Sequence, residues 1–273
     1  MIFPGRDDSG PEEAAMNVTR IVVGANGSSG STAAVRWAAV EAQLRGSELR
    51  VVIAHPRRPS GHAETAEVLH KAVGAARAVA PGLEVRGVAM PGYAVPVLLH
   101  AAEDAVLLVV GEHSGGRMLG APDDSVGNQV ATQARCSVAV VRGRPDCDSG
   151  PVVVEVADEP GSDAVIGRAF EEAALHGTEV LAVTAGPDRR GVAAEVLGTE
   201  MDSRLDPWRA KFRSVPAQRA YVNGRPDRVM VDSCRQARLA VVGPHRQGYP
   251  GALLGAVGTR LLRRADCPVL IVR

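Results

Sequence analysis

The sequence predicts an α/β protein built from two tandem doubly wound domains, each with a five-stranded parallel sheet. Short apolar runs alternate with segments of helical periodicity along the chain, which is typical of strands covered by helices on both faces. The same order of segments then occurs twice, because LLVVG at 107–111 returns as LAVVG at 239–243 and CSVAVVR at 136–142 returns as CPVLIVR at 267–273. A repeat of this length indicates paired domains rather than a solenoid of short units.

The first domain is predicted over residues 18–142 and begins as a βαβ unit. An apolar run starts at Arg20, a Gly/Ser turn follows it, and a helix continues to a glycine stop at Gly46 before the second apolar run. The remaining elements are expected as a helix near 64–80, a strand near 83–88, a helix near 94–102, a strand from 105, a helix near 126–134 and a strand from 137.

A polar segment rich in Pro and Gly, GRPDCDSGP at 143–151, is predicted to link this domain to a second one at 152–273. Residues 1–17 are acidic and lack any hydrophobic period, so we expect a mobile tail there, with Met16 as an alternative start.

The composition excludes several classes of protein. The chain has 273 residues, 31 basic against 31 acidic side chains, and 3% aromatic residues. A nucleic-acid partner is disfavoured, since such proteins need a basic surface or aromatic stacking platforms. No signal peptide and no apolar run of membrane-spanning length is recognisable, so we predict a cytoplasmic protein without a membrane partner. Four cysteines without a CxxC pair are expected to stay reduced.

The candidate ligand site lies between the first and fourth strands of the first domain. Ligands of open parallel sheets bind beyond the carboxyl ends of the strands, where the strand order reverses. If right-handed crossovers place these two strands side by side, the loops at 25–31 and 111–125 form the walls of that crevice. The second wall ends in Asp123, Asp124 and Ser125 just before a helix, whose free amides suit an anion.

The turn VVGANGS at 22–28 and the loop GEHSGGRMLGAPDDSV at 111–126 resemble the universal stress protein family, in tandem over residues 18–273. The resemblance implies that a residue after the first strand, an aspartate in the family, contacts adenine. It also implies that a G-2x-G-9x-G-[ST] loop wraps the ribose and phosphates of ATP. Members are stress-responsive regulators without a well-defined turnover, so no enzyme activity is expected.

The first half keeps part of that pattern. Gly111 and Ser125 are in register, whereas Ser114 and Asp124 replace the second and third glycines and Asn26 replaces the aspartate. Asn26 still offers a donor and an acceptor to an adenine edge. A carboxylate at Asp124 about 5 Å from a phosphate would cost on the order of 1–3 kcal/mol of binding free energy. The expected nucleotide-binding residues are Ala25, Asn26, Gly27, Gly111, His113, Ser114, Ser125 and Val126.

The second half departs further and is predicted to hold a degenerate site. Its loop from Gly243 to Gly255 is one residue shorter, Arg246 replaces the second glycine and Ala256 the hydroxyl residue. Glu155 and Ala157 stand where the first half has Gly24 and Asn26, so ATP is expected in the first domain alone.

Other conspicuous residues are interpreted as structural. His113 and His245 match between the halves, but neither has a second ligand at metal spacing, so no metal site is expected. Cys136 and Cys267 each precede an apolar strand and are expected in the core. Adjacent Glu171 and Glu172 do not face each other on a helix and are interpreted as solvated charges rather than a catalytic pair.

The final strands at 138–141 and 269–272 are expected at the sheet edges, where unpaired backbone groups invite pairing. The resemblance implies dimerisation through this strand, so we predict an intramolecular pseudo-twofold pair and leave a further homodimer open. The sequence thus favours a stress-response regulator with weak adenine-nucleotide binding and an unknown protein partner. The alternative is a nucleotide-independent protein-interaction module on the same fold.

Overall fold

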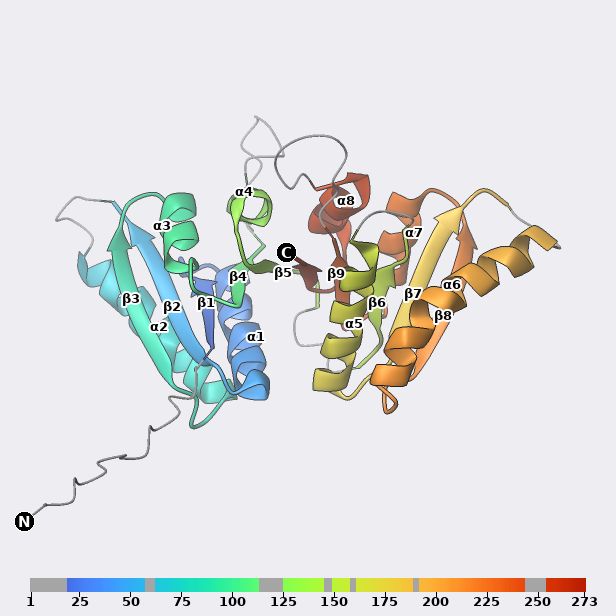
Figure 1. The fold of residues 1–273 in the computed structure, drawn as a ribbon. Coiled ribbons are helices and arrows are strands. Elements are labelled where there is room, and N and C mark those ends of the chain that lie inside the picture. Colours follow the sequence, from blue (N-terminus) through green and yellow to red (C-terminus); the bar gives the residue numbers. More distant parts are fainter. Residues whose placement is uncertain are drawn as a thin grey trace, which may run out of the picture.

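The computed structural model describes residues 19–56, 62–112, 125–144, 149–157, 161–188, 192–243 and 254–273 (Figure 1). The predicted tail and the loop residues His113, Ser114, Asp124, His245 and Arg246 lie outside these ranges.

The strands and helices follow the predicted order in both halves. The first half consists of β1 (Arg20–Gly24), α1 (Ser29–Arg45), β2 (Glu48–His55), α2 (His62–Val79), β3 (Val85–Pro91), α3 (Ala94–Ala101), β4 (Leu107–Gly111), α4 (Val126–Gln133) and β5 (Ser137–Val141). The second half consists of β6 (Val152–Glu155), α5 (Ser162–His176), β7 (Val180–Gly186), α6 (Val192–Lys211), β8 (Ala217–Asn223), α7 (Pro226–Ser233), β9 (Leu239–Val242), α8 (Ala256–Arg264) and β10 (Val269–Ile271).

The strands of the two halves join into one sheet in the order β3-β2-β1-β4-β5-β10-β9-β6-β7-β8. Within each half all strand pairs are parallel, and β1 lies beside β4 as the crossover rule predicts. The fold is therefore two doubly wound five-stranded units, and their sheets are continuous.

The junction between the units is an antiparallel pair of the two final strands. Val269 pairs with Val140, Leu270 with Ala139, and Ile271 with Val138. Residues at equivalent positions of the two final strands, such as Ala139 and Leu270, are related by one constant sequence offset. Because Ala139 pairs with its own equivalent, Leu270, a pseudo-twofold axis passes through this pair. The pairing of these strands that the sequence predicts is present.

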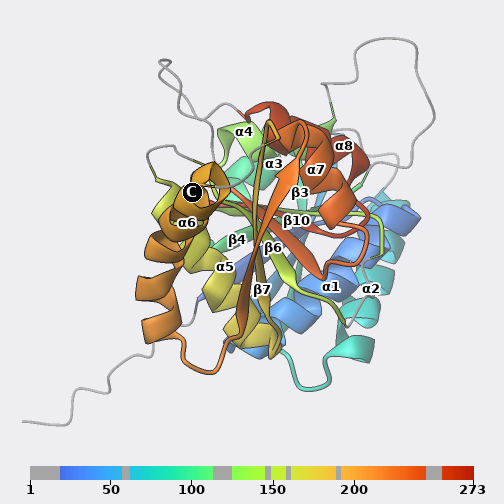
Figure 2. The same ribbon diagram turned by 90° about the vertical axis from the view of Figure 1, so that its right-hand side faces the viewer.

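The helices form one layer on each face of the sheet (Figure 2). One buried cluster packs α1, α2, α5 and α6 against the sheet, and the other packs α3, α4, α7 and α8 against the opposite face. Helix α1 lies close to the strands, because the side chains on its inner face are small. These side chains are fully buried and belong to Ala34, Ala38 and Ala42. In the described part of the chain, no helix is both long and apolar enough to cross a membrane.

Candidate functional site: the crevices at the strand ends

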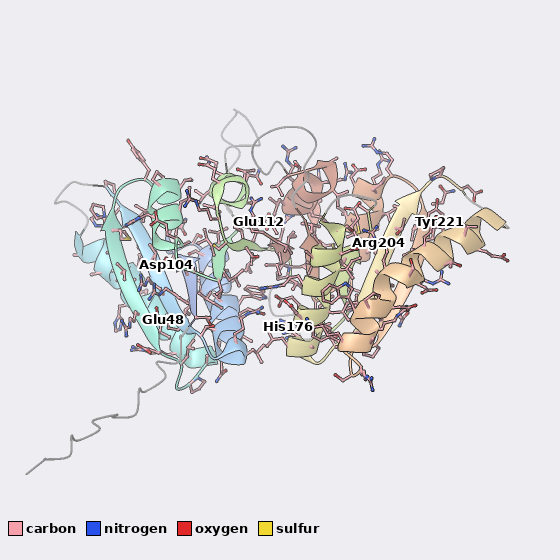
Figure 3. All side chains as sticks on the ribbon, viewed as in Figure 1. Glu48, Asp104, Glu112, His176, Arg204 and Tyr221 are labelled. Carbon is pink, nitrogen blue, oxygen red and sulfur yellow. The ribbon has the colours of Figure 1, made fainter. Side chains whose placement is uncertain are left out.

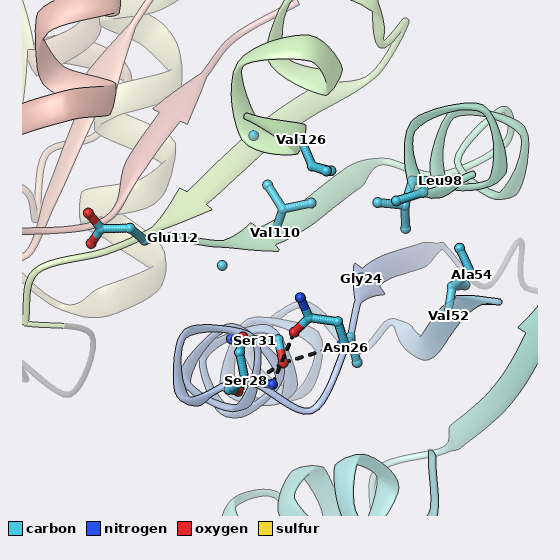
Figure 4. A pocket seen from close by; sticks show the side chains of 14 residues that line it. Gly24, Asn26, Ser28, Ser31, Val52, Ala54, Leu98, Val110, Glu112 and Val126 are labelled. Carbon is cyan, nitrogen blue, oxygen red and sulfur yellow. Dashed lines mark hydrogen bonds between the residues drawn. The ribbon is translucent and has the colours of Figure 1, made fainter. Parts of the chain in front are cut away.

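A cavity of about 100 Å³ lies beyond the carboxyl ends of β1 and β4 (Figure 4). Gly24 and Val110 line it from these two strands, and Val52 lines it from β2. Leu98 of α3 and Val126 of α4 close it from the other side. The cavity therefore occupies the place where the strand order reverses, which is where open α/β sheets bind ligands.

The turn from β1 to α1 is held by its own side chains. The Oδ1 atom of Asn26 accepts from the backbone N–H of Ser28 at 3.0 Å, and the Ser28 hydroxyl caps α1 by accepting from the N–H of Ser31 at 3.2 Å. Gly27 has a φ of 82°, a left-handed conformation that favours glycine. The hydroxyls of Ser28 and Ser31 both bond backbone atoms of this turn.

The amide of Asn26 presents a donor to the cavity. Because a backbone N–H can only donate, its partner on Asn26 must be the oxygen, and the amide nitrogen is left for other contacts. Figure 4 shows this nitrogen turned away from Ser28 toward the cavity. A purine ring offers acceptor nitrogens on its edges, so Asn26 suits a purine by donating to it.

Gly111 allows α1 and β4 to meet at the floor of the crevice. A Cβ atom built at Gly111 would lie 2.2 Å from the carbonyl oxygen of Gly30, which is far inside van der Waals contact. The close approach of the two backbones therefore requires glycine at position 111, independently of any contact with a ligand.

The start of α4 forms the opposite wall. The Ser125 hydroxyl accepts from the N–H of Asn128 at 3.2 Å and caps the helix, while Val126 and Gly127 line the cavity. Glu112, which also lines the cavity, pairs with Arg142 at 3.0 Å. Arg142 in turn donates to the carbonyl of Leu261 in α8 at 2.7 Å, so this wall is tied to the second half.

The structure gathers part of the predicted site. Ala25, Asn26, Gly111 and Val126 line the one cavity, and Gly27 and Ser125 belong to its two turns without lining it. His113 and Ser114 lie outside the described residues. Sequence reasoning missed the lining residues Val52, Ala54, Ala94 and Leu98 from β2 and α3. The available signal was that Val52 and Ala54 lie in the carboxyl-terminal half of the second strand, at the same edge of the sheet as the ends of β1 and β4.

The second half has a larger cavity at the equivalent place, of about 570 Å³. Glu155 and Gly243 line it from the ends of β6 and β9, and the first turns of α5, α7 and α8 surround it. The N-caps of these helices, Gly161, Arg225 and Gly255, make no side-chain capping hydrogen bond. The sequence did not predict that the larger cavity lies in this half.

Asp227 is the buried acid of this second cavity. It pairs with Arg225 at 3.1 Å and with Arg260 at 3.2 Å. Burial acts to raise the pKa of Asp227, but the hydrogen bond from Arg225 and the neighbouring guanidinium charges outweigh it and hold the pKa below its usual range. Asp227 is therefore an ionised, paired group, which fixes the first turn of α7.

Comparison with known proteins gives one consistent result. The model of the universal stress protein family matches residues 17–142 and again residues 149–273. A universal stress protein of Mycobacterium tuberculosis is 30% identical over 290 residues, covering 93% of this chain and 96% of its own, and another from that organism is 30% identical over 265 residues with the same coverage. The crystal structure of a universal stress protein from Archaeoglobus fulgidus covers 93% of this chain with a TM-score of 0.71 at 15% identity, which shows the shared fold.

Proposed function

The chain belongs to the universal stress protein family in tandem form, and we propose that it is a stress-response regulator whose first half binds an adenine nucleotide, with ATP as the first candidate. The observation that carries this proposal is that the Asn26 donor and the start of α4 converge on one cavity between β1 and β4. The amide recognises the purine edge, and the first amides of α4 face the phosphates.

The affinity is expected to be low. Asp123 and Asp124 directly precede the cap of α4 in the sequence, whereas the carboxylate of Glu112 points away from the cavity (Figure 4) and is paired with Arg142. Each carboxylate near a phosphate opposes its binding by on the order of 1 kcal/mol or more. The Ser125 hydroxyl also uses one N–H of α4 that a phosphate would otherwise accept from. We therefore place the dissociation constant in the millimolar range, about −4 kcal/mol.

The second half is proposed as a partner domain with a degenerate site. Glu155 places a carboxylate at the end of β6 where the first half has Gly24, and Ala157 has no donor where the first half has Asn26. The proposed role is also regulatory rather than catalytic. Among the described residues of the first crevice, the hydroxyls of Ser28 and Ser31 bond backbone atoms and meet no base.

Titration calorimetry with ATP and Mg²⁺ tests this proposal. We expect a binding isotherm with one site per chain that Asn26→Ala weakens about tenfold, since one hydrogen bond to a buried edge is lost. The matched control is Ala157→Asn, which alters the equivalent position of the second half and should leave binding unchanged. Absence of heat and of a thermal shift at millimolar nucleotide would remove the nucleotide from the proposal.

The protein-interaction module is the second candidate, because the sequence has Asp124 where the family pattern has a glycine in its phosphate loop. Asp124→Gly separates the two functions. A large gain in ATP affinity means that the crevice is otherwise competent, whereas unchanged absence of binding favours an interaction role without nucleotide.

A further inference from the structure

Five charged side chains form a buried group where α1 of the first half meets α5 of the second. We call Glu41, Arg45, Arg168, Glu172 and His176 the interdomain cluster. The side chains of Glu41 and Glu172 are 1% exposed and that of His176 is 4% exposed. Figure 3 shows His176 at the end of α5 that faces α1. The expectation that Glu172 is a solvated charge is wrong, because it overlooked the helix of the other half.

The cluster is braced across the two helices. Arg45 of α1 donates through Nη2 to Glu172 of α5 at 2.6 Å and to Glu41 of its own helix at 2.9 Å. From α5 to α1, Nε2 of His176 lies 2.8 Å from Oε1 of Glu41. Arg168 adds a bond from Nε to Glu172 at 2.7 Å. Each glutamate is thus held by its own half and by the other half.

The bracing follows the pseudo-twofold symmetry of the β5–β10 junction. The sequence offset that relates Val138 to Val269 also relates Glu41 to Glu172 and Arg45 to His176. Each helix therefore carries a glutamate and, four residues later, a basic residue that reaches the glutamate of the opposite helix. The difference between the halves is that this basic residue is an arginine in the first and a histidine in the second.

Two buried carboxylates lie beside the His176 ring. Glu41 and Glu172 contact it, and Glu171 lies 3.9 Å from Arg168. Within the cluster, the carboxylates of Glu41 and Glu172 balance the guanidiniums of Arg45 and Arg168, so a proton on His176 adds one positive charge in direct contact with Glu41.

The other elements packed against α5 contribute little charge near this end. The sequences of β7 and β9 contain no ionisable residue. Glu155 of β6 lines the second cavity at the opposite end of α5, and Arg204 of α6 pairs with Asp163 in the first turn of α5. Further along α6, Arg209 pairs with Asp202 and Asp206.

A cation is an alternative occupant of this cluster. One ligand atom each from Glu41, Glu172 and His176 lies within 4.8 Å of the others, which is a spacing that a metal ion can bridge. Arg45 already bonds both carboxylates, however, and the guanidinium charges neutralise them. A divalent ion would have to displace Arg45 and add charge to a balanced group, so the contacts favour an ion network of protein groups alone.

We propose that the interdomain cluster is a pH-dependent clasp between the two halves, closed by protonated His176 and loosened when His176 loses its proton. Histidine is the side chain whose charge changes in the physiological range, whereas arginine stays charged. The bond to ionised Glu41 is charge-assisted in both states, and protonation of the ring adds the attraction between opposite charges. The clasp acts on α1 and α5, whose first turns line the two crevices through Ser28 and Ser162.

The sign of the effect follows from the pairing. Since the protonated ring makes the stronger contact with Glu41, we expect clasping to be strongest at low pH and to weaken as the pH rises. Glu41 remains ionised there, because His176 and Arg45 outweigh the effect of its burial and keep its pKa below the usual range.

Hydrogen exchange of the last turns of α1 and α5 at pH 6 and pH 8, corrected for intrinsic rates, measures the clasp directly. In the wild-type chain we expect protection to fall about five- to tenfold between these pH values. His176→Arg should keep high protection at both, and His176→Gln, which retains a neutral donor, should be low at both. The matched control is His100→Gln, since His100 is an exposed histidine of α3 and pairs with Glu103, which follows that helix.

Equal wild-type protection at both pH values, after correction, overturns the proposal. So does a pH dependence in His176→Gln equal to that of the wild type. If His176→Arg does not fold, the comparison of wild type with His176→Gln and His100→Gln still decides the question.

Discussion

Removal of one carboxylate from the interdomain cluster should destabilise the whole chain. In Glu172→Gln, the side chain keeps its size, but Arg45 and Arg168 lose the anion that accepts from them at 2.6 and 2.7 Å. Breaking a buried ion pair by removing one partner costs roughly 3–5 kcal/mol. Because Arg45 keeps Glu41 as a partner, we expect about 3 kcal/mol, which corresponds to a fall of roughly 6–12 °C in Tm.

Urea denaturation followed by far-UV circular dichroism measures this loss of unfolding free energy. The matched control is Glu171→Gln, which changes the adjacent residue in the same way. The Glu171 side chain is 49% exposed, and its contact with Arg168 is 3.9 Å long, so its loss should stay within about 0.5 kcal/mol. If the two variants have equal midpoints, Glu172 does not hold the halves together and the reasoning about the cluster fails.

Two further predictions concern the floor of the first crevice and acid stability. Gly111→Ala should lower the unfolding free energy by about 3 kcal/mol, since the new Cβ would meet the Gly30 carbonyl. In the control, Gly74→Ala in α2, the new Cβ meets nothing, so the chain should be stabilised by roughly 0.5–1 kcal/mol. Equal urea midpoints for the two variants would contradict the close approach at Gly111. The pKa of Glu41 is held below its ordinary value of 4.5, so its contribution to stability is present above that pH and lost as the pH falls through the lower, folded-state pKa. Stability measured from pH 6 to pH 3 should therefore fall less steeply in Glu41→Gln than in the wild type, and parallel curves would refute this.

The sequence predicts the fold well because its signals are local and repeated. Alternation of apolar runs with helices sets each unit, and the crossover rule places β1 beside β4. The pairing of β5 with β10 was also predictable, because both are apolar strands at the edge of their own unit. The continuity of the sheet is the consequence of that pairing.

The sequence indicates the part of the cavity lining that comes from the turn after β1, and it does not indicate the part that depends on packing of α3. Asn26 and Gly111 stand out in glycine-rich turns, whereas Leu98 reaches the same cavity from a helix far along the chain. The burial of Glu172 cannot be inferred from its sequence neighbour Glu171, which is half exposed; its counterpart in the repeat is the buried Glu41. When the two halves are aligned, Glu41 and Glu172 occupy equivalent positions. Equivalent glutamates on α1 and α5 are the sequence signal that indicates the interdomain cluster.

The helix caps provide a test of which half would bind the proposed nucleotide. In the first half, the hydroxyls of Ser28 and Ser125 accept from N–H groups of α1 and α4, and the cavity is small. In the second half, Gly161 and Gly255 leave the starts of α5 and α8 without a side-chain cap around a larger cavity. Uncapped helix starts attract anions, whereas Glu155 repels them. If ATP binding is unchanged in Asn26→Ala and strengthened in Glu155→Gln, the nucleotide site lies in the second half. If Asn26→Ala weakens binding and Glu155→Gln does not change it, the site lies in the first half.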